Sequence, residues 1–91
     1  TGDERFAYDC YRRLIQMYGN VVYEIPMLYF DEILNEVKEE NHYRFDYQLT
    51  AVDLKQIIIR YEQVFQNLLN HPFPQDVYEQ IYGAVLERIA V

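Results

Sequence analysis

The spacing of apolar residues predicts four α-helices joined by short segments. From about Asp3 to Tyr18 the apolar residues share one arc of roughly 200° when a helix is drawn at 100° per residue. That arc contains Phe6, Ala7, Tyr8, Cys10, Tyr11, Leu14, Ile15, Met17 and Tyr18. One neighbouring helix cannot cover so wide an arc, so we expect this helix to be central or covered from outside the chain. Gly19 and Asn20 both tolerate left-handed dihedral angles, which predicts that the helix stops there.

Proline and threonine mark the starts of the next two predicted helices. Pro26 suits the first turn of a helix because its missing amide donor has no partner there anyway, and this second helix is predicted to end near Asn41. Its predicted buried stripe is Tyr29, Phe30, Ile33, Leu34 and Val37. A loop over residues 42–49 follows. Thr50 and Asp53 then form a weakened capping box at the start of a third helix that ends near Asn70.

The third and fourth predicted helices each have one apolar face. That of the third helix contains Leu54, Ile57, Ile58, Tyr61, Val64, Phe65, Leu68 and Leu69. Val52 and Ile59 lie on its opposite face, seven residues apart and therefore one above the other. A fourth helix is predicted from about Pro74, with Gly83 on its polar side and with Val77, Tyr78, Ile81, Tyr82, Val85 and Ile89 facing inward. The predicted fold of residues 1–91 is therefore one small all-α, four-helix domain with no sheet.

Composition and charge narrow the class of protein. The chain has 91 residues, of which 51% are hydrophobic and 25% charged, and this balance argues against disorder. A net charge of −7 repels phosphate backbones and anionic lipid, so we expect no nucleic-acid or membrane partner. No apolar run approaches the ~20 residues of a membrane span, and the polar N-terminus is unlike a signal peptide. Together with a single cysteine, these features predict a cytoplasmic protein.

The sequence carries little catalytic chemistry. The glycines at positions 2, 19 and 83 are isolated, so no phosphate-binding loop is present. Cys10 is on the apolar side of its helix and is predicted to be a small buried hydrophobic residue, not the partner of a histidine. His42 and His71 are predicted to be exposed or helix-end residues, because no further ligands complete a metal site. A solvated face, not a general acid–base site, is predicted for Asp31, Glu32 and Glu36.

Two surface features stand out from this background. The first is a strip of polar residues on the first helix: Arg5, Arg12, Arg13 and Gln16. Pairing with Asp9 and Glu4 on the helix surface is the favoured explanation of this strip, and in an acidic chain the strip is also suited to an acidic partner surface or a phosphate. The second feature is ten tyrosines and no tryptophan. Most are expected at core edges, whereas Tyr43, Tyr47, Val52 and Ile59 are the better candidates for a docking surface.

Four blocks of the sequence resemble pyruvate, phosphate dikinase, in that family's order and spacing. The first is RFAYDCYRRLIQMYG at residues 5–19. The second combines FDEIL at residues 30–34 with VKEE at residues 37–40, and the third is LTAVDLK at residues 49–55. The fourth is FPQD at residues 73–76, followed closely by EQ. Phosphoenolpyruvate synthase, a sister family with the same domain plan, fits these blocks less well.

The resemblance implies a helical subdomain of an N-terminal, ATP-grasp-like nucleotide-binding region. The parent enzyme would be a homo-oligomer that binds ATP and Mg²⁺. It would interconvert two sets of compounds: ATP, phosphate and pyruvate on one side, and AMP, diphosphate and phosphoenolpyruvate on the other. Its remaining domains would be the partners of this chain. The family's Gly-rich nucleotide segments and its Thr-Ser-His motif are absent, so no catalytic, cofactor-binding or metal-binding residue is assigned. The isolated chain is therefore predicted to be inactive.

Within such an enzyme we expect a structural role for the chain, with docking between domains. The residues predicted for docking are Arg12, Arg13, Gln16, Val52 and Ile59. A stand-alone, tyrosine-rich protein-interaction module is the alternative. An independent nucleotide binder is a third hypothesis, which requires chemical-shift changes on addition of ATP and magnesium; we expect none.

Overall fold

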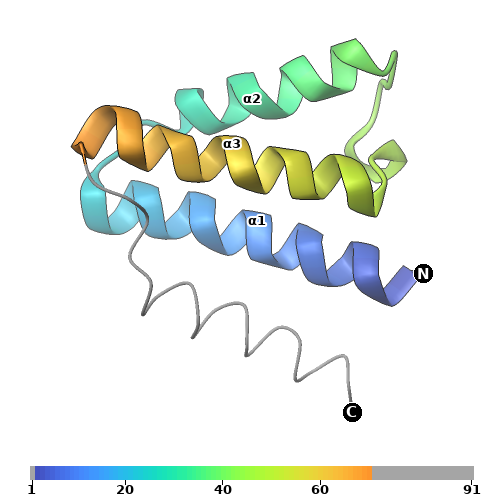
Figure 1. Ribbon diagram of the computed structural model, residues 1–91, viewed down its shortest axis with the longest axis horizontal. Coiled ribbons are helices and arrows are strands. Elements are labelled where there is room, and N and C mark those ends of the chain that lie inside the picture. The colour runs from blue at the N-terminus through green and yellow to red at the C-terminus, as the bar shows by residue number, and fades with distance from the viewer. Residues whose placement is uncertain (1, 71–91) are drawn as a thin grey trace.

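The computed structural model describes residues 2–70, which form three α-helices and one 3₁₀ turn. The elements are α1 (Gly2–Tyr23), α2 (Met27–Glu40), η1 (Asp46–Gln48) and α3 (Ala51–Leu69). Helix α2 runs antiparallel to α1 and α3 (Figure 1). Residues 2–70 contain no strand, so the predicted all-α class is confirmed. The predicted fourth helix lies outside the described residues. No helix within 2–70 is long and apolar enough to cross a membrane.

Helix α3 forms the main packing surface. It packs closely against α1 and also against α2, whereas α1 and α2 touch each other little. Its buried residues are Leu54, Ile57, Ile58, Tyr61, Val64 and Phe65, as predicted, while Leu68 is exposed. The ring of Phe30 from α2 meets the ring of Tyr61 edge-on, with centroids 4.9 Å apart. The core therefore lies along α3.

Helix α2 buries a narrower stripe than its sequence predicts. Phe30, Leu34 and Val37 are buried, but Ile33 is half-buried and Tyr29 is exposed. The physical reason is that α2 packs on α3 along one side and touches α1 little.

Helix α1 continues past the predicted stop at Gly19 and Asn20. A Cβ atom at Gly19 would lie 2.9 Å from the Cζ atoms of both Phe30 and Phe65, so glycine is required there for close packing and not for a turn. The helix ends at Tyr23, and the next residue, Glu24, has a φ of 57°. The predicted stop was wrong because a glycine that ends a helix and one that admits a neighbouring side chain look alike in sequence.

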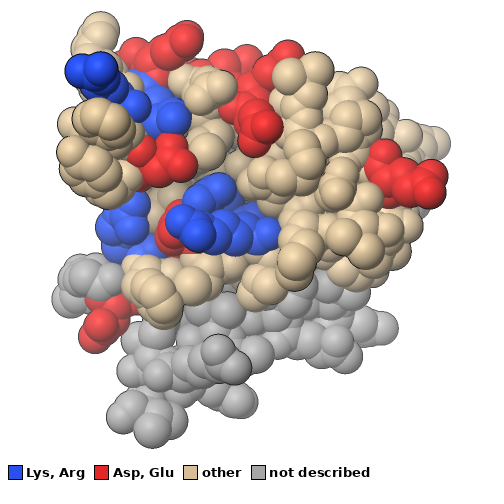
Figure 2. Space-filling view, turned by 180° about the vertical axis from the view of Figure 1, so that it is seen from behind, with Lys and Arg blue, Asp and Glu red and all other residues tan. Residues whose placement is uncertain are grey.

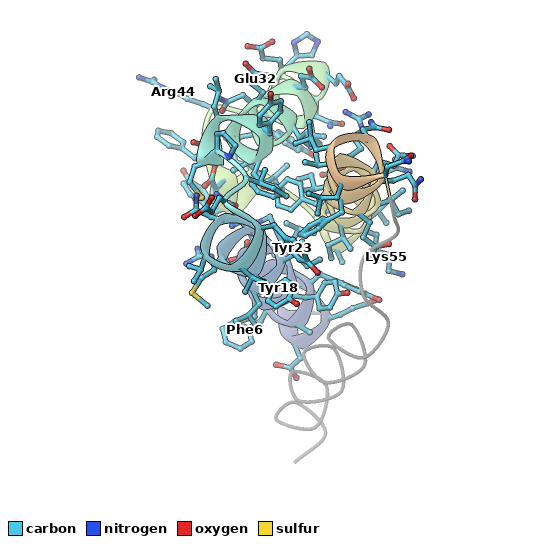
Figure 3. All side chains as sticks on the ribbon, turned by 90° about the vertical axis from the view of Figure 1, so that its left-hand side faces the viewer. Phe6, Tyr18, Tyr23, Glu32, Arg44 and Lys55 are labelled. Carbon is cyan, nitrogen blue, oxygen red and sulfur yellow. The ribbon has the colours of Figure 1, made fainter. Side chains whose placement is uncertain are left out.

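The apolar arc of α1 is covered only in part by the other described helices. Ala7, Tyr11 and Ile15 are buried. Phe6 is exposed and points away from α2 and α3 (Figure 3). Cys10 is half-buried and not fully buried as predicted, because it lies toward the side of the arc that α2 and α3 leave open.

The ends of α2 and α3 are set by local hydrogen bonds. The capping box predicted at α3 is present: the Asp53 amide donates to Thr50 Oγ1 (3.2 Å), and the Thr50 amide donates to Asp53 Oδ2 (2.9 Å). His42 follows α2 with a φ of 59°. The amide of Tyr43 donates to the Lys38 carbonyl (2.8 Å), the pattern of a Schellman motif. His42 is thus an exposed helix-end residue, as predicted.

Candidate docking groove between α1 and α2

A groove lies between α1 and α2 on the face shown in Figure 2. It consists of two hollows of about 440 and 530 Å³, which adjoin because Arg13 and Asp46 line both. We call one hollow the basic end; it is lined by Arg5, Asp9, Arg13, Lys38, Arg44, Phe45, Asp46 and Tyr47. We call the other the methionine end; its lining includes Arg12, Gln16, Met17, Met27, Asp31 and Leu34.

Arg5 holds the loop that forms the outer wall of the basic end. Its Nε donates to the Leu49 carbonyl (2.7 Å) and its Nη2 to the Asp46 carbonyl (2.9 Å). The side-chain oxygen of Gln48 also accepts from the amides of Arg44 and Phe45, both at 2.8 Å. The two hydrogen bonds of Arg5 were not predictable from the sequence, because backbone carbonyls about forty residues away leave no periodic signal.

The tip of this loop presents aromatic side chains to solvent. The rings of Phe45 and Tyr47 stack at 5.3 Å with an interplanar angle of 11°, and both are exposed. The guanidinium of Arg44 lies 5.4 Å from the centre of the Phe45 ring. Tyr43, by contrast, packs against the core. Of the two loop tyrosines predicted for docking, only Tyr47 is therefore exposed.

Buried polar side chains form the floor of the groove. Arg12 is 5% exposed and Gln16 is 9% exposed. Arg12 forms an ion pair with Asp9 at 2.7 Å. The Gln16 oxygen accepts from the Tyr61 hydroxyl (3.2 Å) and from Arg12 Nη1 (3.5 Å), while Gln16 Nε2 donates to Asp31 Oδ1 (3.4 Å). This network joins all three helices through one glutamine.

The network also affects two ionisation equilibria. Burial by itself lowers the pKa of Arg12, but its hydrogen bond to Asp9 and the negative charge of that carboxylate outweigh burial and leave the pKa raised. Burial raises the pKa of Tyr61, and the nearby Arg12 only partly opposes this. Arg12 is therefore charged and Tyr61 neutral at physiological pH.

The five predicted docking residues lie in two separate places. On α1, Arg13 is exposed at the rim and forms an ion pair with Asp9 at 3.2 Å, whereas Arg12 and Gln16 belong to the buried floor. Val52 and Ile59 are exposed on α3, as predicted, but line neither hollow.

The basic end concentrates positive charge in an acidic chain. Four Lys or Arg side chains line it against two carboxylates, and the basic side chains gather toward one side of the face in Figure 2. Asp9 pairs with both Arg12 and Arg13, and Asp46 pairs with Lys38 at 2.8 Å. No carboxylate within residues 2–70 pairs with Arg44.

The part of the chain that the structure describes offers no preformed cluster of metal ligands. Residues 2–70 contain no group of three or more His, Cys, Asp or Glu side chains arranged for a metal. Asp31, Glu32 and Glu36 are exposed, as predicted for a solvated face, and Glu36 pairs with Arg60 at 3.8 Å.

Comparison with known proteins identifies what the chain resembles. No protein-family model matches it. It is 46% identical over 86 residues to pyruvate, phosphate dikinase of Clostridium symbiosum, which is 93% of this chain and 10% of that enzyme. The corresponding enzyme of Rhizobium meliloti is 43% identical over 85 residues, again 93% of this chain and 10% of the relative. The chloroplastic pyruvate, phosphate dikinase 1 of Zea mays is 45% identical over 83 residues, which is 91% of this chain and 9% of the relative.

These relatives match nearly the whole chain, but the chain spans only about a tenth of their length. The resemblance found in the sequence blocks is therefore confirmed: the chain corresponds to one segment of pyruvate, phosphate dikinase.

Proposed function

We propose that the chain is the helical subdomain of the nucleotide-binding region of a pyruvate, phosphate dikinase-like phosphotransferase. Residues 1–91 would form one subdomain of a longer, cytoplasmic, homo-oligomeric enzyme, with a structural and docking role toward its other domains. The similarity to the Clostridium symbiosum enzyme supports this origin.

The observation that carries the docking role is the α1–α2 groove with its buried polar floor. Helices α1 and α2 touch little, yet Gln16 and Arg12 join both walls of the groove to Tyr61 on α3. A satisfied buried network of this kind restricts how helices are placed. Arg12 and Gln16 would thus hold the groove in shape, and Arg13 would contact the docked domain. Val52 and Ile59 would form a second, apolar contact on α3.

The chemistry of the parent enzyme would lie outside this chain. Phosphoryl transfer needs a phosphate cradle, a metal site and an acceptor held in line. The sequence contains no Gly-rich phosphate loop. ATP and Mg²⁺ would therefore be bound by other parts of the longer polypeptide, which converts ATP, phosphate and pyruvate to AMP, diphosphate and phosphoenolpyruvate.

Reversing the charge of Arg13 in the full-length enzyme tests the docking role. Arg13→Glu replaces the exposed cation at the rim, which pairs with Asp9, by a negative charge, and we expect turnover to fall about tenfold. Glu32→Lys is the control for charge reversal, because Glu32 is exposed on α2 and lines neither hollow. Unchanged turnover and unchanged partial reactions in Arg13→Glu would contradict the docking role.

The alternative, a stand-alone tyrosine-rich interaction module, has one observation in its favour. The stacked pair Phe45 and Tyr47 is exposed on the loop tip, where aromatic residues are suited to a protein partner. The coding sequence distinguishes the two functions. An ATP-grasp segment encoded next to these residues supports the subdomain, whereas stop codons directly on both sides support the module.

A further inference from the structure

The two ends of the α1–α2 groove differ in chemistry. At the basic end, Arg13 and Arg44 are exposed and offer planar guanidinium groups. At the methionine end, Met17 and Met27 are exposed on facing helices, above the buried Leu34. A ligand that combines negative charge with an apolar group would therefore complement both hollows.

We propose that the groove binds an acidic segment from another part of the longer polypeptide. Its carboxylates lie against Arg13 and Arg44, and an apolar side chain that follows them lies between Met17 and Met27. This inference rests on the proposed function, because it names the chemistry of the docked partner.

The ion pairs within the groove leave positive charge available. Arg12 and Arg13 share the single carboxylate of Asp9, so one of these two guanidinium charges is not balanced by Asp9. Arg44 has no carboxylate partner within residues 2–70, and Gln48 holds its backbone amide in place. Exposed guanidinium groups bind carboxylates through two parallel hydrogen bonds. The groove therefore offers two positions for carboxylates.

The charge of the whole chain favours one orientation for an acidic partner. The chain carries a net charge of −7, so an acidic segment is repelled by the surface as a whole and attracted by the basic end. Complementary charge of this kind fixes register and excludes wrong contacts. The same net charge argues against a nucleic acid as the occupant.

The methionine end suits an apolar side chain whose shape is not specified in advance. Methionine is unbranched and polarizable, so it adapts to different partners. Met27 is also in contact with the floor, because Gln16 Nε2 lies 3.9 Å from its sulfur. The longer polypeptide has ample length to supply such a segment. About nine-tenths of a relative such as the Clostridium symbiosum enzyme lies outside the region that matches this chain.

Zero-length cross-linking of the full-length enzyme tests this inference. A carbodiimide joins a lysine amine to a carboxylate only when the two are in direct contact. Arg44→Lys and Arg13→Lys keep the positive charge at the rim and add an amine, and mass spectrometry then identifies the joined peptides. We expect each variant to give a new cross-link to an Asp or Glu outside residues 1–91, in a segment that also contains an apolar residue.

Two lysines of the native chain provide internal controls. Lys38 lies 2.8 Å from Asp46, so that pair should cross-link in every sample and show that the groove is reactive. Lys55 on α3 lines neither hollow and should give no link to the same segment.

Several results would overturn the inference. One is a Lys38–Asp46 link without any new link from position 13 or 44. Another is links that join two different polypeptides when isotope-labelled and unlabelled enzyme are mixed, which would show a second copy as the occupant. A third is the absence of any link from position 44 together with protection of its new amine by inorganic phosphate, which would show an anion site.

The outcome is separable from that of the docking test. If Arg13→Glu slows turnover but no new cross-link forms, docking stands and the acidic segment is wrong. If the cross-link forms and turnover of Arg13→Glu is unchanged, the segment binds and the docking role in turnover is wrong. Reversing the cross-linked carboxylate to Lys in the Arg13→Glu enzyme should restore turnover to within about threefold of the wild type.

Discussion

At the scale of single residues, Gly19 shows how one missing side chain shapes the core. Alanine at this position favours a helix by about 1 kcal/mol over glycine. Its Cβ, however, would meet the buried rings of Phe30 and Phe65 at 2.9 Å, and forcing extra atoms into a packed core costs about 1–3 kcal/mol.

We therefore expect Gly19→Ala to lower the free energy of unfolding by about 1 kcal/mol, because overpacking outweighs helix propensity. Urea denaturation followed by circular dichroism measures the change. Val21→Ala, at an exposed position two residues further along α1, is the comparison for general effects of alanine near this turn. A Gly19→Ala variant that is more stable than the wild type would show that the rings move aside freely.

The buried phenol of Tyr61 predicts that the free energy of unfolding depends on pH. Burial raises its pKa above the usual value of 10.0, so folding favours the neutral phenol. Its contribution to stability is complete below the unfolded-state pKa and is lost as pH rises through the raised folded-state pKa.

In Tyr61→Phe the hydrogen bond to Gln16 is removed, and we expect a loss of about 1 kcal/mol near pH 7. The difference from the wild type should shrink above about pH 10, because only the wild type must then keep a buried phenol neutral. Urea unfolding of both proteins across this pH range measures the difference. A constant difference would mean that Tyr61 ionises equally well in the folded and unfolded chain.

At the scale of elements, the loop over residues 43–49 depends on one side chain of α1. Arg5 bonds the carbonyls of Leu49 and Asp46, and η1 closes with the Leu49 amide donating to the Asp46 carbonyl at 3.1 Å. A segment held by few contacts opens locally more readily than the helices around it.

Arg5→Met keeps much of the apolar stem and removes both hydrogen bonds. We expect the Gln48 and Leu49 amides to exchange with solvent about tenfold faster, since about 1.4 kcal/mol of local stability is lost. Amides in the middle of α3 should keep their rates. Hydrogen exchange followed by NMR measures both sets, and equal acceleration everywhere would show that Arg5 stabilises the whole fold instead.

At the scale of the whole molecule, α1 and α2 both pack on α3 within residues 2–70 and leave an open groove between them. Figure 3 shows this arrangement along the helix axes, with Arg44 and Phe6 pointing outward. A groove between a helix pair that touches little is suited to a neighbouring domain, and its walls depend on the buried network of Arg12, Gln16 and Tyr61.

Whether the chain can catalyse a reaction on its own is also a property of the whole molecule. We expect the isolated 91-residue chain to produce no AMP from ATP, phosphate and pyruvate with magnesium, because phosphoryl transfer needs groups that its sequence motifs do not supply. Addition of ATP with magnesium should also leave the amide chemical shifts unchanged. The full-length enzyme assayed in parallel is the positive control. AMP formation by the chain alone would contradict its assignment as a structural subdomain.

Much of the fold was predictable because it depends on local pattern. The apolar face of α3 and its Thr50–Asp53 cap follow from periods of three and four residues and from one reciprocal hydrogen-bonded pair. The end of α1 was not predictable in this way, since the role of Gly19 depends on rings 11 and 46 positions away. The predicted fourth helix falls outside residues 2–70, so its status remains that of a prediction.

The candidate docking groove, like the fold, was predictable from the sequence only in part. The sequence by itself determined the helical class, the acidic balance, the polar strip on the first helix and the resemblance to pyruvate, phosphate dikinase, because each depends on residue identity and spacing. Only the tertiary structure decided that Arg12 and Gln16 are buried while Arg13 is exposed. Neighbours on one helix face share a period, but which of them is covered depends on where α2, α3 and the loop pack.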